Sequence, residues 1–442
     1  MTVAIFLGSL LIAMAIGIPI AYSLLLSGIA LMWHLDLFDA QILAQNVING
    51  ADSFPLLAVP FFMLAGEIMN VGGLSKRIVK LALAVVGHVP GGLGYVAIMA
   101  AVILAAVILA AVSGSAVADA AALASLLLPM MVAAGYDKAR SAGLIASAGI
   151  IAPVIPPSIG FVIFGVAANV PISKLFLAGI VPGVLLGIAL AITWWWLVRS
   201  EKVAPPARAS RAEVLKALRE SVWALGLPVI ILVGLRMGVF TPTEAAVVAA
   251  VYALFVAMVV YRELSFRQLA DIFQAAARTS AVVMFLVAAA MVSAWLITVA
   301  DLPSKIIGML EPFMGNQTLL LVAIMLLVMI VGTAMDMTPT ILILTPVLMP
   351  VVKAAGIDPV YFGVLIIINN AIGLITPPVG TVLNVVAGVG RISMSDVTRG
   401  AMPFMLAQFI VMFLLVAFPS IVMFLLVAFP SIVMVPLRWL GG

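Results

Sequence analysis

Two aspartates interrupt otherwise apolar sequence, and each is followed at a matched distance by a proline. Asp119 and Asp336 each precede a proline by ten residues, and the pairs Pro156-Pro157 and Pro377-Pro378 each follow a glycine by 21 residues. A carboxylate in apolar surroundings can hold a cation or accept a hydrogen bond, and prolines interrupt helices and free carbonyl oxygens. The same pattern of polar and proline residues therefore occurs twice. This is typical of a repeat protein whose broken helices form a binding site within a membrane.

The stretches around the two aspartates favour tight turns. The first runs from Ser113 to Asp119 and contains small residues and hydroxyls. A re-entrant turn of this kind survives at membrane depth only if it is buried in protein or lines a wet cavity. Close helix packing by small residues is the alternative, although packing does not need an ionisable group. The second stretch, 332–340, has Pro339 where a returning helix would start. Each aspartate could be a cation partner, a substrate-side acceptor or a helix N-cap.

The proline pairs define the second element of each half. Residues 152–158 and 373–380 both combine the pair with Ser or Thr. Unwound carbonyls and hydroxyls are oxygen ligands suited to Na⁺, and the positive N-termini of half-helices suit a carboxylate. Near the second pair, Asn369, Asn370 and Asn384 could hydrogen-bond a polyhydroxylated substrate or bridge helices.

Composition restricts the fold class. The chain has 442 residues, of which 66% are hydrophobic and 9% charged, more apolar than a soluble core requires. Apolar runs of 18 or more residues recur without alternation, which indicates helical spans, about ten to twelve in all. We expect residues 1–33 to form a retained first span rather than a signal peptide.

Several function classes are excluded or disfavoured. The absence of Cys rules out disulfides and thiolate chemistry, and two separated His residues do not form a metal cluster. The net charge of +4 does not imply nucleic-acid binding, because Lys and Arg orient membrane spans. No phosphate-binding GxxxxGK[ST] motif is present, so direct ATP drive is not expected.

A polar stretch at 199–220 divides the chain into halves, 1–198 and 221–442. Its positive charge places it on the cytoplasmic side, either as an ordinary loop or as an amphipathic interface helix that joins two repeats. We predict an all-α polytopic membrane protein with two inverted-topology repeats, each with a re-entrant helical hairpin and a Pro-broken helix. The hairpins are expected near 113–119 and 332–340, and the broken helices near 152–158 and 373–380.

Three further sequence features predict local structure. Five residues at 102–106 are repeated at 107–111, which would rotate a helix by about 140° just before the first polar turn. Eleven residues at 410–420 are repeated at 421–431, which would overlengthen the last span. The three tryptophans at 194–196 are expected to form an interfacial aromatic anchor.

With these motifs together, the chain resembles the large membrane subunit (DctM-like) of the TRAP, or tripartite ATP-independent periplasmic, transporters. The motifs that carry the resemblance are Pro60-Phe61-Phe62 with Gly66-Glu67, the Ser113 to Asp119 turn, Pro156-Pro157-Ser158, Thr241-Pro242-Thr243-Glu244-Ala245 and Gly373 to Pro378. Residues 49–54 and 73–79 are similar to the subgroup that transports 2,3-diketo-L-gulonate.

The resemblance implies a non-enzymatic transporter of the bacterial inner membrane that imports an organic acid such as 2,3-diketo-L-gulonate with Na⁺. A C4-dicarboxylate or another sugar acid is the alternative substrate. The resemblance further implies a periplasmic substrate-binding protein, a small four-helix membrane subunit, and a scaffold that carries an elevator-type transport domain. Two coupling Na⁺ ions and no organic cofactor are expected.

The resemblance also implies site residues. The first sodium site would use Ser113, Gly114, Ala152, Ile155 and Pro157, where the family usually has Gly in place of Ala152. The second sodium site would use Gly332, Gly373, Thr376 and Val379. The substrate would lie near Ser115, Asp119, Ser158, Asp336, Thr338 and Thr381.

The residues alone allow one further function and disfavour another. An intramembrane aspartyl hydrolase could let Asp119 and Asp336 share a proton. A channel would require a continuous polar lining, which the sequence outside the breaks lacks.

Overall fold

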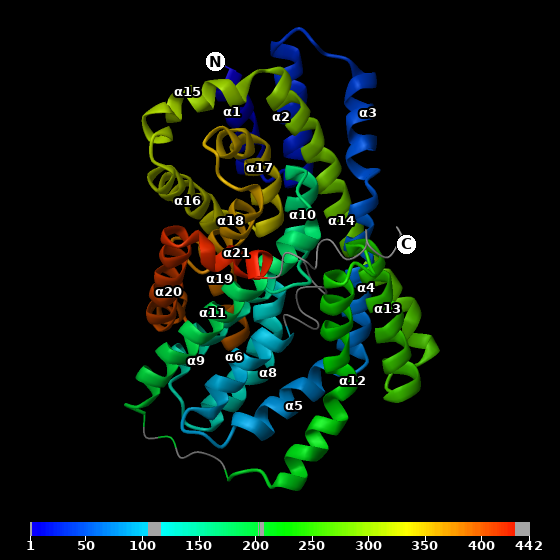
Figure 1. Ribbon diagram of the computed structural model, residues 1–442, viewed down its shortest axis with the longest axis vertical. Coiled ribbons are helices and arrows are strands. Elements are labelled where there is room, and N and C mark those ends of the chain that lie inside the picture. The colour runs from blue at the N-terminus through cyan, green and yellow to red at the C-terminus, as the bar shows by residue number, and fades with distance from the viewer. Residues whose placement is uncertain (1, 105–115, 202, 204–206, 429–442) are drawn as a thin grey trace.

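The structure is a computed structural model that describes residues 2–104, 116–201, 203 and 207–428 (Figure 1). Every regular element in this described part is a helix. Nine of the described helices are long and apolar enough to cross a membrane, or ten if the bent pair α9 (Lys138–Gly149) and α10 (Ile159–Ala168) forms one span. The chain is therefore an all-helical polytopic membrane protein.

A first helix group combines the beginnings of both halves. Its members are α1 (Thr2–Ala15), α2 (Ile20–His34), α3 (Ala40–Ala51), η1 (Phe54–Leu57), α4 (Ala58–Val71), α5 (Leu74–Val86), α12 (Arg211–Arg236), α13 (Pro242–Phe255), η4 (Val256–Val260) and α14 (Phe266–Val299). Within this group α13 packs along α4, α12 packs along α5, and α14 packs against α2, α3 and α4.

A second helix group contains both helices that are broken by the proline pairs. Its members are α6 (Gly92–Leu104), α8 (Ala116–Ala133), α9, η3 (Ala152–Val154), α10, α11 (Ile172–Val198), α15 (Leu302–Met314), α16 (Gln317–Ala334), α17 (Met337–Ala354), α18 (Pro359–Gly373), α19 (Thr381–Gly390), α20 (Met394–Ala417) and α21 (Pro419–Ala428). The two groups meet where α5 packs on α6, where α14 packs on α17, and where α10 packs on α4 and η1. Figure 1 shows α15 near one end of the molecule and α5 near the other.

The two halves of the second group use the same local signals at the same spacing. Gly135 and Gly356 have positive φ angles of 94° and 69°, and they end α8 and α17. Asp137 and Asp358 then cap α9 and α18 by accepting hydrogen bonds from backbone N–H groups. These pairs are each 221 residues apart, as are the two proline pairs. The sequence thus dictates the same elements twice.

The two broken helices run in opposite directions. The Lys138 ammonium, at the start of α9, donates a hydrogen bond of 3.3 Å to the carbonyl of Arg391, at the end of α19. In agreement, α10 packs on α17 and α18, whereas α19 packs on α8 and α9. Each half-helix that follows a break therefore lies beside the hairpin and broken helix of the other half.

The second part of the connector is helical, as one of the two sequence interpretations expected. Residues 211–220 are helical, but they are the first turns of α12, which continues without a break to Arg236. A capping box starts this helix: the Ser210 N–H donates to the Glu213 carboxylate at 2.6 Å, and the Glu213 N–H donates to the Ser210 hydroxyl at 3.2 Å. At the other end, Glu201 pairs with Arg140 of α9. Burial raises the pKa of the Glu201 carboxyl above its usual value, although Arg140 opposes this shift.

One local expectation is wrong, and a second fails at one of its three residues. The eleven-residue duplication does not lengthen the last span, because α20 ends at Ala417 and a new helix begins at Pro419. Proline has no N–H to continue the helix and disfavours helical geometry in the residue before it. Of the three tryptophans expected at the interface, Trp194 is fully buried and its indole N–H donates to the Gly91 carbonyl at 2.8 Å, whereas Trp195 and Trp196 are exposed. The five-residue duplication extends into residues outside the described part.

The packing of α9 on α20 supplies a test of the fold. A Cβ added to Gly400 would overlap the backbone carbonyl of Ala139. Gly388 of α19 has no atom within 4 Å of its added Cβ. We predict that Gly400→Ala lowers the free energy of unfolding by about 1–3 kcal/mol. Gly388→Ala should leave it unchanged or raise it by about 0.5–1 kcal/mol. Thermal unfolding of the purified variants measures both, and equal effects would contradict the close contact.

Candidate functional site

The first break lies between α9 and α10. Pro156 and Pro157 have no N–H groups, so they cannot donate to the carbonyls four residues earlier, those of Ala152 and Pro153. The Ser158 hydroxyl donates to the Pro153 oxygen at 2.6 Å. The same hydroxyl oxygen accepts from the N–H of α10 residue Phe161 at 3.4 Å and caps that helix. The Ala152 oxygen is left without its helical donor.

The second break repeats this arrangement between α18 and α19. Its proline pair deprives the carbonyls of Gly373 and Leu374 of their helical donors. The Val382 N–H donates to the Leu374 oxygen at 3.0 Å, and the Thr376 N–H donates to the Gly373 oxygen at 2.9 Å. A carbonyl oxygen has two lone pairs, so the Gly373 oxygen keeps acceptor capacity. At the 221-residue offset Ala152 corresponds to Gly373, so the two proline pairs remove the helical donors of equivalent carbonyls.

The start of α19 differs from the start of α10. The N-cap of α19 is Gly380, in left-handed geometry with φ 53°, and it offers no side chain. The Thr381 hydroxyl is buried and has no hydrogen-bond partner among the described residues. The N–H groups at the positive end of α19 thus lack the side-chain acceptor that Ser158 provides at the start of α10. This favours an anionic group at the start of α19.

The second hairpin consists of α16, α17 and a short turn at Met335-Asp336. Asp336 is the N-cap of α17, and its carboxylate accepts from the Met337 N–H at 2.8 Å. The Thr340 hydroxyl donates to the Asp336 carbonyl at 2.9 Å. Of the three roles considered for Asp336, the helix N-cap is the one that these contacts support.

This hairpin lies directly against the second break. A Cβ on Gly373 would be 2.9 Å from the carbonyl carbon of Gly332, so the two backbones touch where α16 crosses α18. The Gly380 N–H also donates to the Thr333 carbonyl at 3.2 Å. Two predicted sodium-site residues, Gly332 and Gly373, are therefore brought to one crossing, and a third, Thr376, follows Gly373 by three residues.

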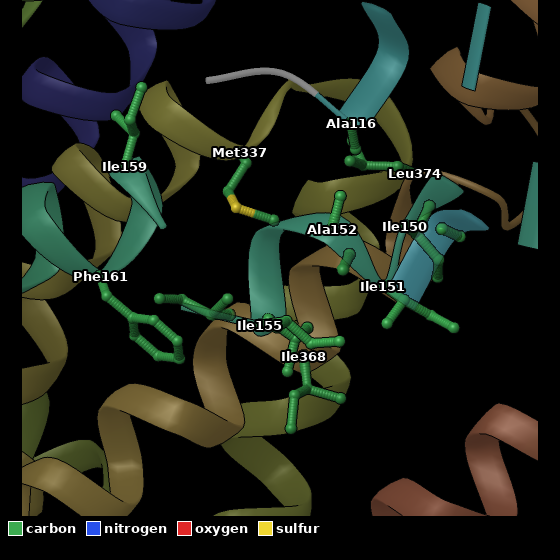
Figure 2. Close-up of a cluster of buried hydrophobic side chains, with 14 of the residues drawn as sticks. Ala116, Ile150, Ile151, Ala152, Ile155, Ile159, Phe161, Met337, Ile368 and Leu374 are labelled. Carbon is green, nitrogen blue, oxygen red and sulfur yellow. The ribbon is translucent and has the colours of Figure 1, made fainter. Parts of the chain in front are cut away.

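The tip of the second hairpin also reaches the first break. Figure 2 shows Met337 extending from the hairpin toward the segment that bears Ala152 and Ile155. The sulfur of Met337 would be 3.0 Å from a Cβ placed on Gly160, near the start of α10. Met337 was not among the predicted site residues, because an apolar side chain in an apolar sequence gives no signal of such a position.

The remaining predicted residues are placed as follows. Ser113, Gly114 and Ser115 lie outside the described residues. Ala152, Ile155, Pro157 and Ser158 are buried in the first break. Asp119 is buried in α8, and Thr338 is buried in the first turn of α17. Val379 is 40% exposed, and its carbonyl accepts from the Asn384 amide at 2.8 Å.

The pairing of the two aspartates is corrected by the structure. At the 221-residue offset that relates the breaks, Asp119 corresponds to Thr340, and Asp336 corresponds to Ser115. The equal spacing to a proline was misleading because α17 contains two prolines, Pro346 and Pro350. Asp336 starts its helix, whereas Asp119 lies within α8, so the two carboxylates are not equivalent groups.

Comparisons with known proteins agree on one family. The family model described as the DctM component of the tripartite ATP-independent periplasmic transporter matches residues 7–421. The 2,3-diketo-L-gulonate TRAP transporter large permease protein of Escherichia coli (strain K12) is 56% identical over 440 residues, which is 100% of both chains. The isethionate TRAP transporter permease protein DctMQ of Oleidesulfovibrio alaskensis is 38% identical over 409 residues, covering 92% of this chain and 64% of that protein.

A solved structure supports the fold. The crystal structure of the Alcanivorax borkumensis YdaH transporter, described as having an unusual topology, superposes with a TM-score of 0.61. The match covers 86% of this chain and 89% of that chain at 17% sequence identity. At this identity the similarity concerns the architecture alone.

The crossing of α16 and α18 yields a prediction. Gly373→Ala should push the Gly332 backbone away, because the added Cβ would be closer than real Cβ contacts allow. We expect a loss of about 1–3 kcal/mol in the free energy of unfolding, together with loss of transport. Gly308→Ala, in α15 with no atom within 4 Å, is the matched control. Thermal unfolding and uptake assays on both variants test this, and wild-type behaviour of Gly373→Ala would refute the contact.

Proposed function

The chain belongs to the DctM family of large TRAP transporter permeases, and on that premise we propose that it couples the entry of Na⁺ to the import of an organic acid. Members of this family are multi-pass transporters of the bacterial inner membrane and not enzymes. The hypothesis of an intramembrane aspartyl hydrolase is therefore wrong.

The proposed substrate is 2,3-diketo-L-gulonate. The observation that carries this choice is the 56% identity, over the whole length of both chains, to the permease named for that acid. The start of α19 has no side-chain cap, and the Thr381 hydroxyl has no partner among the described residues, which suits the carboxylate of such a substrate. A relative at 38% identity is named for isethionate, a different acid, so a C4-dicarboxylate or another sugar acid stays as the alternative.

Two sodium sites are proposed, one at each break. The first would combine Ser113 and Gly114 with the carbonyls of Ala152, Ile155 and Pro157. The support for it is the Ala152 oxygen, which lacks its helical donor because of the proline pair. Oxygens of this kind, on unwound backbone, coordinate Na⁺ in transporters with broken helices.

The second site would combine Gly332, Gly373, Thr376 and Val379. Its support is the backbone contact of Gly332 with Gly373 and the position of Thr376, whose hydroxyl donates to the Ile372 carbonyl at 2.8 Å. That bond uses the hydroxyl hydrogen, and the oxygen lone pairs remain for a cation. At a membrane potential of about 100 mV, each uncompensated charge that moves inward contributes roughly 2.3 kcal/mol.

We also propose that the second helix group is the moving part and the first helix group the scaffold. The antiparallel packing of the two broken helices supports an inverted-topology repeat. A cavity of about 490 Å³ lies where the groups meet, lined by Ser53, Phe54, Asn169, Thr241 and Thr243 among others. Incomplete packing at this boundary is compatible with an elevator-type displacement.

Membership of the family implies a small membrane subunit and a soluble binding protein. The match to a DctMQ permease, of which this chain covers 64%, supports the first of these, since that protein combines both permease components. We propose that the small subunit has four helices and that the binding protein delivers the acid from the periplasm.

Uptake by proteoliposomes tests the function. They would hold the chain with its small subunit, and would receive binding protein and labelled 2,3-diketo-L-gulonate with or without an inward Na⁺ gradient. We expect Na⁺-dependent accumulation, and we expect Thr376→Ala to raise the half-maximal Na⁺ concentration at least about tenfold, because a ligand oxygen is lost. Thr376→Ser keeps the hydroxyl and should preserve coupling.

Thr279→Ala is the matched control, because Thr279 makes the same kind of bond, to the Ala275 carbonyl at 3.1 Å, in the first helix group. Na⁺-dependent uptake of a dicarboxylate instead would change the substrate but not the mechanism. Accumulation of any acid without Na⁺ dependence would contradict the proposed coupling.

A further inference from the structure

Asn370 presents an unexplained buried oxygen near the end of α18. Its side chain is completely buried. The amide nitrogen donates to the Met337 carbonyl at the tip of the second hairpin, at 3.3 Å. The amide oxygen has no hydrogen-bond partner among the described residues. A buried amide oxygen without a donor is unfavourable, so it indicates a group that the polypeptide does not supply.

The oxygen of Asn370 lies at the crossing of α16 and α18. A Cβ on Gly332 would be 2.6 Å from this oxygen, so glycine is required there for the amide to fit. Gly332 in turn touches the backbone of Gly373. The unpaired oxygen is therefore adjacent to two of the four residues proposed for the second sodium site.

Asn369, the preceding residue, shows what a purely structural asparagine looks like in this helix. It is also buried, and its amide donates to the Met325 carbonyl of α16. Its side chain lines an apolar cavity with Met325, Phe409 and Phe413, away from the break. Both asparagines thus bridge α18 to the second hairpin, but of the two only Asn370 places its amide oxygen at the glycine crossing.

We propose that Asn370 is a side-chain ligand of the second sodium ion and that its amide links this ion to the hairpin tip. The inference rests on the proposed sodium coupling. Neutral amide oxygens are suitable ligands for hard cations. With Na⁺ on its oxygen, the amide is fixed in the orientation that donates to the Met337 carbonyl, and the tip stays against the break. When Na⁺ leaves, the amide loses this restraint, and the tip is released.

Three variants separate this role from simple packing. Asn370→Leu has a similar volume but no oxygen, Asn370→Asp keeps an oxygen in the same place, and Asn369→Leu is the matched control. The first readout is the rise in the thermal unfolding midpoint of the purified chain with Na⁺ compared with K⁺. The second is the Na⁺ concentration for half-maximal uptake in proteoliposomes.

We expect Asn370→Leu to abolish the Na⁺-induced stabilisation and to raise the half-maximal Na⁺ concentration at least about tenfold. Asn370→Asp should keep the stabilisation, and Asn369→Leu should respond to Na⁺ as the wild type does, whatever its basal stability. If Asn370→Leu does not fold, Asn370→Asp decides, because loss of its Na⁺ response would overturn the assignment.

A labelling experiment tests the link to the tip. The chain contains no Cys, so Met337→Cys introduces a single reactive thiol, while the carbonyl that Asn370 contacts is kept. Na⁺ should slow alkylation of this thiol severalfold, and Asn370→Leu should remove that protection.

The outcomes separate the two proposals. If the wild type responds to Na⁺ and Asn370→Leu responds like Asn369→Leu, the role of Asn370 is overturned and sodium coupling stands. If the wild type shows no Na⁺ response in unfolding, labelling or uptake, both proposals fail.

Discussion

Loss of backbone donors at two proline pairs is the constraint on which the site depends. In the hydrocarbon region no water replaces a missing N–H, so each freed carbonyl needs a partner from the protein or from a ligand. The protein supplies one partner in the first half, the Ser158 hydroxyl, and two in the second, the N–H groups of Val382 and Thr376. The Ala152 oxygen is left without its helical donor and the Gly373 oxygen keeps a second lone pair, so a cation would be favourable at both carbonyls.

The antiparallel packing of the two halves places the two breaks close to each other. Because α10 lies beside the second hairpin and α19 beside the first broken helix, both breaks and the tip of the second hairpin come together. Glycines at 332 and 373 let the backbones touch, and Met337 extends from the tip toward the other break (Figure 2). A group bound at one break can thus influence the hairpin that touches both. This is the physical basis that we propose for coupling ion binding to substrate movement.

Features set by local chemistry could be predicted from the sequence. The helix breaks follow from proline, the helix ends from Gly135 and Gly356, and the helix starts from Asp137 and Asp358. Features set by packing could not be predicted in this way. Trp194 was expected at the membrane interface, yet a contact with distant Gly91 buries it. The equivalence of Asp119 with Asp336 failed because spacing to one proline does not identify a structural register. Asn370 was recognised as polar and near the break, but its unpaired oxygen depends on the approach of α16.

We propose that the glycine crossing binds Na⁺. The most direct measurement is an experimental structure of the chain with its small subunit, determined once in Na⁺ and once in K⁺. The account predicts density between the oxygens of Gly373, Thr376 and Asn370 in Na⁺, with the hairpin tip held against the break, and no such density in K⁺. Identical maps in the two salts, with the Asn370 oxygen unpaired in both, would contradict it.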